Sequence, residues 1–219
     1  MSIAFTKAPE GELARFYPII DCQESGHDAG GLAAQLVEAG CDMLQVRAKG
    51  ATSAEFFSFS KAVVARVGRR SCVIINDRFD IALAVRAGGV HLGEFDLPVG
   101  AVREIAPEGF IIGATARDPQ TALSAQEAGA DYIGAGAVFP TGSKSDTRFI
   151  GLEGLAGIAG SVKIPVYGIA GITLENCASV VRAGAYGCAG ITAVARAQDP
   201  ARAFRNLEQT LRQAAQARE

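Results

Sequence analysis

Short apolar runs rich in β-branched residues alternate along this chain with longer alanine-rich segments of helical period. Each apolar run has the length and the nearly continuous hydrophobic character of a buried strand in a parallel sheet. The predicted strands are Arg15–Asp21, Met43–Arg47, Cys72–Asn76, Gly89–Leu92, Phe110–Thr115, Tyr132–Val138, Pro165–Ala170 and Gly187–Ile191. The predicted helices are Ala29–Ala39, Ser53–Val67, Arg78–Ala87, Val99–Ile105, Pro119–Ala128, Gly154–Ala159, Leu174–Ala183 and Pro200–Ala215.

The residues at the helix ends support these boundaries. Thr52 or Ser53 is placed to cap the second predicted helix, with Glu55 near its start. Asp118 and Asp199 each stand directly before a proline, which is the favoured order of N-cap and first helical residue. A glycine follows the apolar stripe of four helices, where a left-handed residue is expected. These glycines are Gly40, Gly88, Gly129 and Gly184.

Repeated strand–helix units predict a parallel sheet covered by helices. Three helix-to-strand passages are near copies, Glu-Ala-Gly-Cys-Asp at 38–42, Glu-Ala-Gly-Ala-Asp at 127–131 and Arg-Ala-Gly-Ala-Tyr at 182–186. Eight such units in 219 residues predict an α/β fold, a single (β/α)8 TIM barrel domain over residues 1–219. The alternative, an open doubly wound sheet, needs a Gly-x-Gly-x-x-Gly turn after an early strand, which this sequence lacks.

Composition narrows the classes of partner. The formal net charge of −2 gives no broad basic surface for nucleic acid. The longest stretch without charge has 13 residues, too few to span a membrane, and the first residues lack a signal-peptide pattern. Five scattered cysteines without a Cys-x-x-Cys pair favour a reducing compartment, so we expect a cytoplasmic protein. With only two histidines, the chain cannot form a metal site of several histidines. The oligomeric state is not determined by the sequence, and a homodimer is one possibility.

Polar side chains follow the second predicted strand. Side chains alternate along a strand, so Gln45, Arg47 and Lys49 share one face while Val46 and Ala48 share the other. The apolar face must meet the helices, which leaves the two cations and the amide facing the barrel mouth. Such a group suits an anion or a polar ring. The alternative is a solvated strand at the rim.

Two carboxylates follow the next two strands. Asp77 comes directly after the third strand and Asp96 lies in the loop after the fourth. Mg²⁺ is commonly bound by one or two carboxylates together with substrate phosphate oxygens, so this pair predicts a Mg²⁺ site. Asp77 could instead cap the following helix. His91, on the fourth strand, is more typical of a hydrogen-bonded core histidine than of a catalytic one.

The last three strands end in loops suited to phosphate. The segment 139–148 is long, rich in hydroxyl groups and carries Lys144 and Arg148, so it could close over a phosphorylated substrate or simply be a surface loop. Small residues follow strands seven and eight, where phosphate often binds in such barrels. Strand six has no lysine for Schiff-base chemistry. The sequence thus predicts an enzyme that handles a diphosphate and a monophosphate with Mg²⁺.

Five motifs occur in order at these strand ends and together resemble thiamine-phosphate synthase over residues 16–193. They are Gln-x-Arg-x-Lys at 45–49, Asn-Asp-Arg at 76–78, Gly-Val-His-Leu-Gly at 89–93 followed by Asp96, Tyr-Ile-Gly-x-Gly-x-x-x-Pro-Thr-x-x-Lys at 132–144 and Gly-Ile-x-Gly-Ile at 168–172. The family joins a hydroxymethylpyrimidine diphosphate to a thiazole phosphate and releases pyrophosphate. The resemblance therefore implies these two substrates and Mg²⁺.

The resemblance also implies roles for single residues. The pyrimidine diphosphate would be bound by Gln45, Arg47, Lys49 and Asn76, with Thr115 in place of a family hydroxyl that is usually serine. Asp77 and Asp96 would hold Mg²⁺, and Lys144 would contact the leaving diphosphate. The thiazole phosphate would meet Thr141, Ser143, Gly171, Ile191 and Thr192. The implied catalytic residues are Arg47, Lys49, Lys144 and Thr115, with no dedicated general base.

This sequence departs from the family pattern at four positions. Ala170 stands where glycine is frequent, Glu94 replaces a common glutamine, Gly88 a usual aspartate and Ala48 a frequent glutamate. Two other functions therefore stay open: a thiazole tautomerase-like isomerase and a non-catalytic barrel that binds phosphate ligands. The tautomerase relatives tend to carry a histidine two residues past the fifth-strand hydroxyl, where this chain has Arg117.

Overall fold

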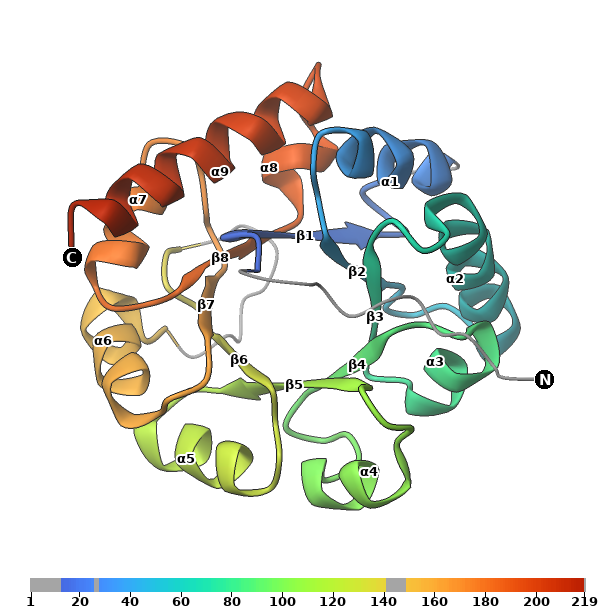
Figure 1. Ribbon diagram of the computed structural model, residues 1–219, viewed down its shortest axis with the longest axis horizontal. Coiled ribbons are helices and arrows are strands. Elements are labelled where there is room, and N and C mark those ends of the chain that lie inside the picture. The colour runs from blue at the N-terminus through green and yellow to red at the C-terminus, as the bar shows by residue number, and fades with distance from the viewer. Residues whose placement is uncertain (1–12, 26–27, 141–148, 219) are drawn as a thin grey trace.

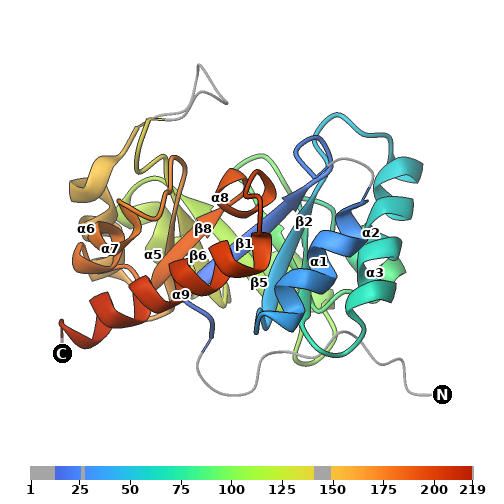
Figure 2. The same cartoon turned by 90° about the horizontal axis from the view of Figure 1, so that it is seen from above.

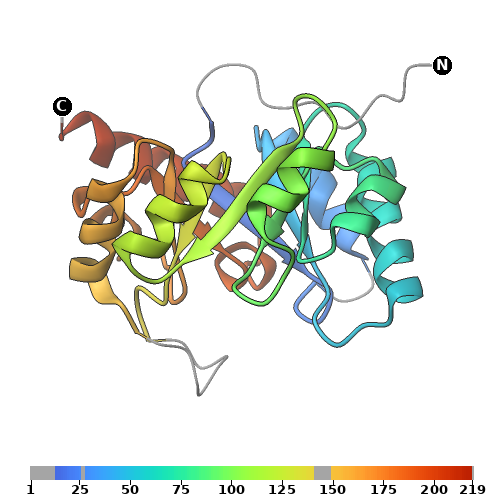
Figure 3. The same cartoon turned by 90° about the horizontal axis from the view of Figure 1, so that it is seen from below.

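The computed structural model describes residues 13–25, 28–140 and 149–218. In these ranges eight parallel strands pair in chain order and close into a barrel, with helices around the outside (Figure 1). The (β/α)8 TIM barrel predicted from the sequence is therefore confirmed. Side views show the helices standing around the strands, and the long C-terminal helix lying across the outside (Figure 2, Figure 3).

The observed bounds agree closely with the predicted ones. The strands are β1 (Phe16–Asp21), β2 (Met43–Arg47), β3 (Cys72–Asn76), β4 (Gly89–Leu92), β5 (Ile111–Ala116), β6 (Tyr132–Ala135), β7 (Val166–Ile169) and β8 (Gly187–Gly190). The helices are α1 (Ala29–Glu38), α2 (Ser53–Val67), α3 (Phe79–Val85), α4 (Val99–Ile105), α5 (Pro119–Glu127), α6 (Gly151–Ser161), α7 (Cys177–Arg182), α8 (Thr192–Ala195) and α9 (Pro200–Gln216). Over the described ranges, no helix has both the length and the apolar character needed to cross a membrane.

Strand β6 is shorter than predicted. Strand β6 ends at Ala135 rather than Val138, because the N–H groups of Val138 and Phe139 donate to the carbonyls of Ile169 and Ala170. These bonds are out of step with the pairing of Ala135 and Gly168, so the regular ladder between β6 and β7 stops there.

Helix α7 begins three residues later than predicted. The side-chain oxygen of Asn176 accepts a hydrogen bond from the N–H of Thr173 at 2.9 Å, so the residues before Cys177 form a turn. Helix α8, a single turn after β8, was not predicted, because four residues show no helical period.

The predicted helix caps are confirmed except for one. Thr52 and Glu55 form a reciprocal capping box at α2, and Asp118 and Asp199 each accept from an N–H three residues later. The prediction for Gly88 is wrong, because the left-handed residue that ends α3 is Arg86, at φ 60°. The other three predicted glycines do have positive φ: Gly40, Gly129 and Gly184.

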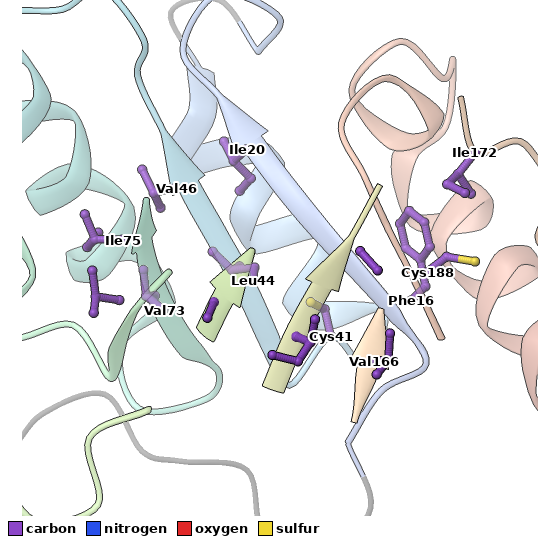
Figure 4. Packing of buried hydrophobic residues seen from close by; sticks show 14 of the residues in the cluster. Phe16, Ile20, Cys41, Leu44, Val46, Val73, Ile75, Val166, Ile172 and Cys188 are labelled. Carbon is purple, nitrogen blue, oxygen red and sulfur yellow. The ribbon is translucent and has the colours of Figure 1, made fainter. Parts of the chain in front are cut away.

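Strand alternation divides the hydrophobic residues between two layers. Outward side chains such as Leu44, Val46 and Ile75 pack between the sheet and the helices (Figure 4). Inward side chains fill the barrel itself, so the interior is a packed core and not a pore. This inner layer consists of Tyr17, Ile19, Met43, Cys72, Ile74, Tyr132, Tyr167 and Ala189.

Polar groups within the barrel are joined by hydrogen bonds. Gln45 Nε2 donates to Tyr17 Oη at 3.1 Å, and the Tyr17 and Tyr132 hydroxyls lie 2.9 Å apart. His91 Nδ1 lies 3.1 Å from Tyr132 Oη, and its Nε2 lies 3.0 Å from Thr115 Oγ1. Desolvation of the His91 ring lowers its pKa to about 4, although part of the side chain still reaches the barrel mouth.

A methyl group at Gly113 would not fit inside this barrel. Its Cβ would lie 2.1 Å from Tyr132 Cζ, and the ring is fully enclosed. We expect Gly113→Ala to lower the free energy of unfolding by about 3 kcal/mol or more, measured by urea denaturation. The control is Gly157→Ala on the exposed side of α6, where the new Cβ makes an ordinary 3.6 Å contact with Pro119 Cγ. That variant should gain about 0.5–1 kcal/mol, and equal effects of the two substitutions would contradict this packing.

The low pKa of His91 predicts a loss of stability in acid. The folded pKa of about 4 lies below the ordinary value of 6.5, so between these pH values the unfolded chain binds a proton that the folded chain does not. The free energy of unfolding should therefore fall as the pH drops from 6.5 to 4, by up to about 3 kcal/mol from this residue. Urea denaturation of the wild type and of His91→Gln at pH 7.0 and 4.5 measures the difference. Equal losses in the two proteins would refute it.

Candidate active site

An ion pair joins the ends of the first two strands. The register pairs Asp21, the last residue of β1, with Arg47, the last residue of β2, and the guanidinium contacts the carboxylate. Asp21 is only 3% exposed and Arg47 18%, so the contact is shielded from water. Asp21 is not among the site residues predicted from the sequence. Its signal was a lone acidic residue that closes an apolar strand, the same signal that singled out Asp77.

A second cation lies beside the next strand. The Lys49 ammonium contacts the carboxylate of Asp77, and the two side chains are 55% and 19% exposed. Asp77 does not cap α3, because the N-cap residue of that helix is Arg78 and no side chain caps it. Asp77 instead has a left-handed backbone with φ 64°, a costly conformation that is typical of functional sites.

The two predicted metal ligands converge at Gly93. A Cβ at Gly93 would lie 3.0 Å from Asp96 Oδ2 and 3.9 Å from Asp77 Oδ1. Burial raises the pKa of Asp96, the hydrogen bond from Gly93 N at 2.6 Å opposes this rise, and the neighbouring Asp77 adds to it. Within the described residues, no cluster of three or more His, Cys, Asp or Glu side chains is arranged to hold a metal. Asp77 and Asp96 offer two carboxylates, a set of the kind that Mg²⁺ shares with substrate phosphates.

Three more predicted residues lie on the inner face of β2, β3 and β5. Gln45 is 3% and Asn76 8% exposed, whereas Thr115 is partly exposed. Their neighbours Val46 and Ala48 belong to the layer under the helices, as the alternation predicted. The second, third and fifth strands therefore present amide and hydroxyl groups on the inner face of the barrel.

Among the described residues, those predicted to contact the thiazole phosphate lie beyond the ends of β7 and β8, across the barrel mouth from β2 and β3. The register pairs Ile169 with Ala189, so Gly171 and Ile191 each lie two residues beyond paired positions. A Cβ at Gly171 would lie 2.7 Å from Phe139 Cβ, which leaves no room for a side chain. Thr192 begins α8. The predicted residues Thr141, Ser143 and Lys144 lie outside the described residues.

One departure from the family pattern, Glu94, has a partner of opposite charge. The carboxylate of Glu94, in the loop after β4, forms an ion pair with the guanidinium of Arg117, just past β5. The charge introduced by Glu94 is therefore compensated by Arg117. Ala170 has a left-handed backbone with φ 81°, a conformation for which glycine is the usual residue.

The sequence of this chain is similar to those of known proteins over most of its length. A family model described as thiamine monophosphate synthase matches residues 16–194. The thiamine-phosphate synthase of Haloquadratum walsbyi is 40% identical over 193 residues, which cover 84% of this chain and 86% of that protein. The thiamine-phosphate synthase of Pyrococcus horikoshii is 42% identical over 178 residues, covering 81% and 86%.

Solved structures extend the likeness to three dimensions. Thiamine phosphate pyrophosphorylase from Pyrococcus furiosus superimposes with a TM-score of 0.82 at 38% identity, covering 92% of this chain and 96% of that one. A 3-hexulose-6-phosphate synthase, at 20% identity and a TM-score of 0.68, covers 90% of this chain and 99% of its own, and shares the fold. From the matched family model and these relatives, the chain belongs to the thiamine-phosphate synthase family of enzymes.

Proposed function

We propose that this chain joins 4-amino-2-methyl-5-(diphosphooxymethyl)pyrimidine to a thiazole phosphate and releases thiamine phosphate and pyrophosphate. The observation that carries the proposal is the convergence of two cations and two carboxylates at the ends of β2, β3 and β4. A site with this composition suits a diphosphate that is bound together with a divalent cation. Membership of the thiamine-phosphate synthase family supports the same substrates.

The side chains of the two cations, Arg47 and Lys49, differ in how freely they can move. Asp21 holds Arg47 in a shielded ion pair, so Arg47 offers its remaining N–H groups from a fixed position. Lys49 is 55% exposed on a flexible side chain, so it can exchange the Asp77 carboxylate for a diphosphate oxygen. With Gln45 and Asn76 on the inner face, these residues would bind the pyrimidine diphosphate.

Asp77 and Asp96 would hold Mg²⁺ in this proposal. When bound, the ion would neutralise charge on the leaving diphosphate. The two carboxylates converge at Gly93, whose absent side chain leaves the space beside Asp96 open. Burial raises the pKa of Asp96 and the nearby Asp77 adds to the rise, and a bound cation would offset the repulsion between the two carboxylates.

The chemical step is substitution at the pyrimidine methylene carbon. Its bond to the diphosphate oxygen breaks, the aminopyrimidine stabilises the cation, and the thiazole nitrogen supplies the electron pair of the new bond. Arg47, Lys49, Thr115 and Lys144 would stabilise the charge on the leaving group. The thiazole phosphate would be held by Thr141, Ser143, Gly171, Ile191 and Thr192, which would orient the nitrogen for attack. No proton has to be removed for the bond to form.

A pyrophosphate-release assay with both substrates, with and without Mg²⁺, tests the proposed reaction. We expect thiamine phosphate and pyrophosphate to form in equal amounts. Each alternative function has its own signature. Isomerisation of a thiazole phosphate without coupling would indicate a tautomerase-like enzyme. Calorimetric binding of the ligands without pyrophosphate release would indicate a binding barrel. Either result would overturn the proposal.

Removal of a proposed metal ligand should abolish the metal-dependent reaction. We expect Asp77→Ala to lower Mg²⁺-dependent turnover by about 100-fold or more, because several kcal/mol of transition-state stabilisation are lost. Binding of Mn²⁺, followed by electron paramagnetic resonance, should weaken in parallel. The control is Asp80→Ala, which removes an exposed carboxylate paired with Arg78 at the start of α3. Unchanged turnover and Mn²⁺ binding in Asp77→Ala would refute the metal assignment.

Loss of the Asp21 carboxylate should weaken diphosphate binding through Arg47. Asp21→Asn keeps the shape of the side chain but frees the guanidinium from its shielded partner. We expect KM for the pyrimidine diphosphate to rise about tenfold, with KM for the thiazole phosphate unchanged, because a charged hydrogen bond is worth about 1.5–3 kcal/mol. Asp80→Asn, which breaks the exposed pair with Arg78, should change neither constant. An equal rise of both KM values in Asp21→Asn would contradict a local role.

A further inference from the structure

A chain of hydrogen bonds crosses the barrel interior and links two residues of the proposed site. It begins at the Gln45 amide and runs through the hydroxyls of Tyr17 and Tyr132 to the His91 ring and Thr115 Oγ1. Its four donor–acceptor distances lie between 2.9 and 3.1 Å. The middle of this chain is inside the barrel, because Tyr17 and Tyr132 are 2% and 1% exposed.

The chemistry of the groups gives the chain a direction. Gln45 Nε2 can only donate, so Tyr17 Oη accepts from it and directs its own proton to Tyr132 Oη. Tyr132 Oη, having accepted, donates to His91 Nδ1. In the opposite direction Tyr17 Oη would receive two donors, and its own buried proton would have no acceptor among these groups. A buried unpaired donor is costly, so the first direction is favoured.

This direction determines the protons at both ends. His91 Nδ1 accepts, so the neutral ring carries its proton on Nε2 and donates it to Thr115 Oγ1. The proton of the Thr115 hydroxyl is therefore directed away from the histidine. Thr115 is partly exposed, so this proton can reach an acceptor in the barrel mouth. At the other end, the carbonyl oxygen of the Gln45 amide points away from Tyr17.

Close packing holds the rings of this chain in place. The His91 and Tyr132 rings are stacked with centroids 5.5 Å apart, and the Tyr17 and Tyr132 rings meet nearly at right angles. A Cβ at Gly113 would lie 2.1 Å from Tyr132 Cζ, and one at Gly134 would lie 3.0 Å from His91 Cε1. The two glycines thus leave the space that the rings occupy.

We propose that Tyr17, Tyr132 and His91 are positioning residues that hold the Thr115 hydroxyl as a hydrogen-bond donor to the diphosphate group. They act through Thr115 without touching the substrate. The inference rests on the proposed function for its ligand, whereas the direction of the hydrogen bonds is a property of the protein alone. The two parts are therefore tested separately.

The tautomer of His91 tests the direction without any activity measurement. Nitrogen-15 chemical shifts of the imidazole ring distinguish a proton on Nε2 from one on Nδ1. The chain has two histidines, so His27→Gln identifies the signals of His91. We expect His91 to carry its proton on Nε2 in the wild type, and the Nδ1–H form to appear in Tyr132→Phe. A wild-type ring protonated on Nδ1 would overturn the inference even if the enzyme proves to be fully active.

Steady-state kinetics test the positioning role. Tyr132→Phe removes the donor to His91, and we expect about a tenfold fall in kcat/KM for the pyrimidine diphosphate. The matched control is Tyr167→Phe. Tyr167 is also fully buried, but its hydroxyl donates to the backbone carbonyl of Ala14 at 3.0 Å, outside this chain. Tyr167→Phe should leave kcat/KM unchanged.

A double-mutant cycle separates positioning from general support of the fold. In a Thr115→Val background the hydroxyl is already absent, so adding Tyr132→Phe should lower kcat/KM no further. If Tyr132→Phe costs the same factor with and without the Thr115 hydroxyl, the tyrosine does not act through Thr115 and the inference fails. Pyrophosphate release that is absent already in the wild type would refute the proposed function, and the tautomer of His91 would still test the chain of hydrogen bonds.

Discussion

The interior of a closed barrel has a limited volume, and the inward side chains of eight strands must fill it. Three tyrosines, Tyr17, Tyr132 and Tyr167, occupy most of the inner layer, and Gly113 faces the Tyr132 ring where any side chain would collide. Filling a core with tyrosine buries hydroxyl groups, which then need partners. Two of these hydroxyls bond to one another and extend toward the mouth through Gln45 and His91. The packing of the tyrosines in the inner layer thereby determines which polar groups reach the site.

The charges at the mouth follow a related constraint. A cation held away from water needs a partner, and Arg47 has one in Asp21, which is almost fully shielded. Breaking that pair would leave an isolated buried carboxylate, so Arg47 keeps its place when an anion arrives. Lys49 and Asp77 are more exposed, and their pair costs little to separate. The site therefore combines a fixed cation with a movable one, an arrangement suited to a group that is bound as a substrate and released as a product.

The fold and the strand ends could be predicted because alternation along one strand is a local property. It placed Gln45 and Arg47 on the inner face and Val46 under the helices, as observed. The contact between Asp21 and Arg47 depends on the register of two strands, and the bonds of His91 depend on Thr115 of β5 and Tyr132 of β6. Such pairings between distant segments have no signature within a single segment. The wrong prediction at Gly88 has a local cause, since Arg86 had already ended the helix in the left-handed conformation.

A substitution that needs no proton transfer depends on dipoles that are oriented before the charge appears. In water, the solvent must reorganise around a leaving diphosphate, whereas groups already directed at it avoid that cost. A freely rotating hydroxyl would have to reorient as solvent does, because its proton can point in several directions. In the proposed direction of the chain, His91 Nε2 donates to the oxygen of Thr115, 3.0 Å away, and so restricts where the hydroxyl proton can point. In the proposed site a neutral histidine therefore contributes to catalysis without transferring its proton to the substrate, because the ring would keep a neighbouring hydroxyl in the orientation that the developing charge requires.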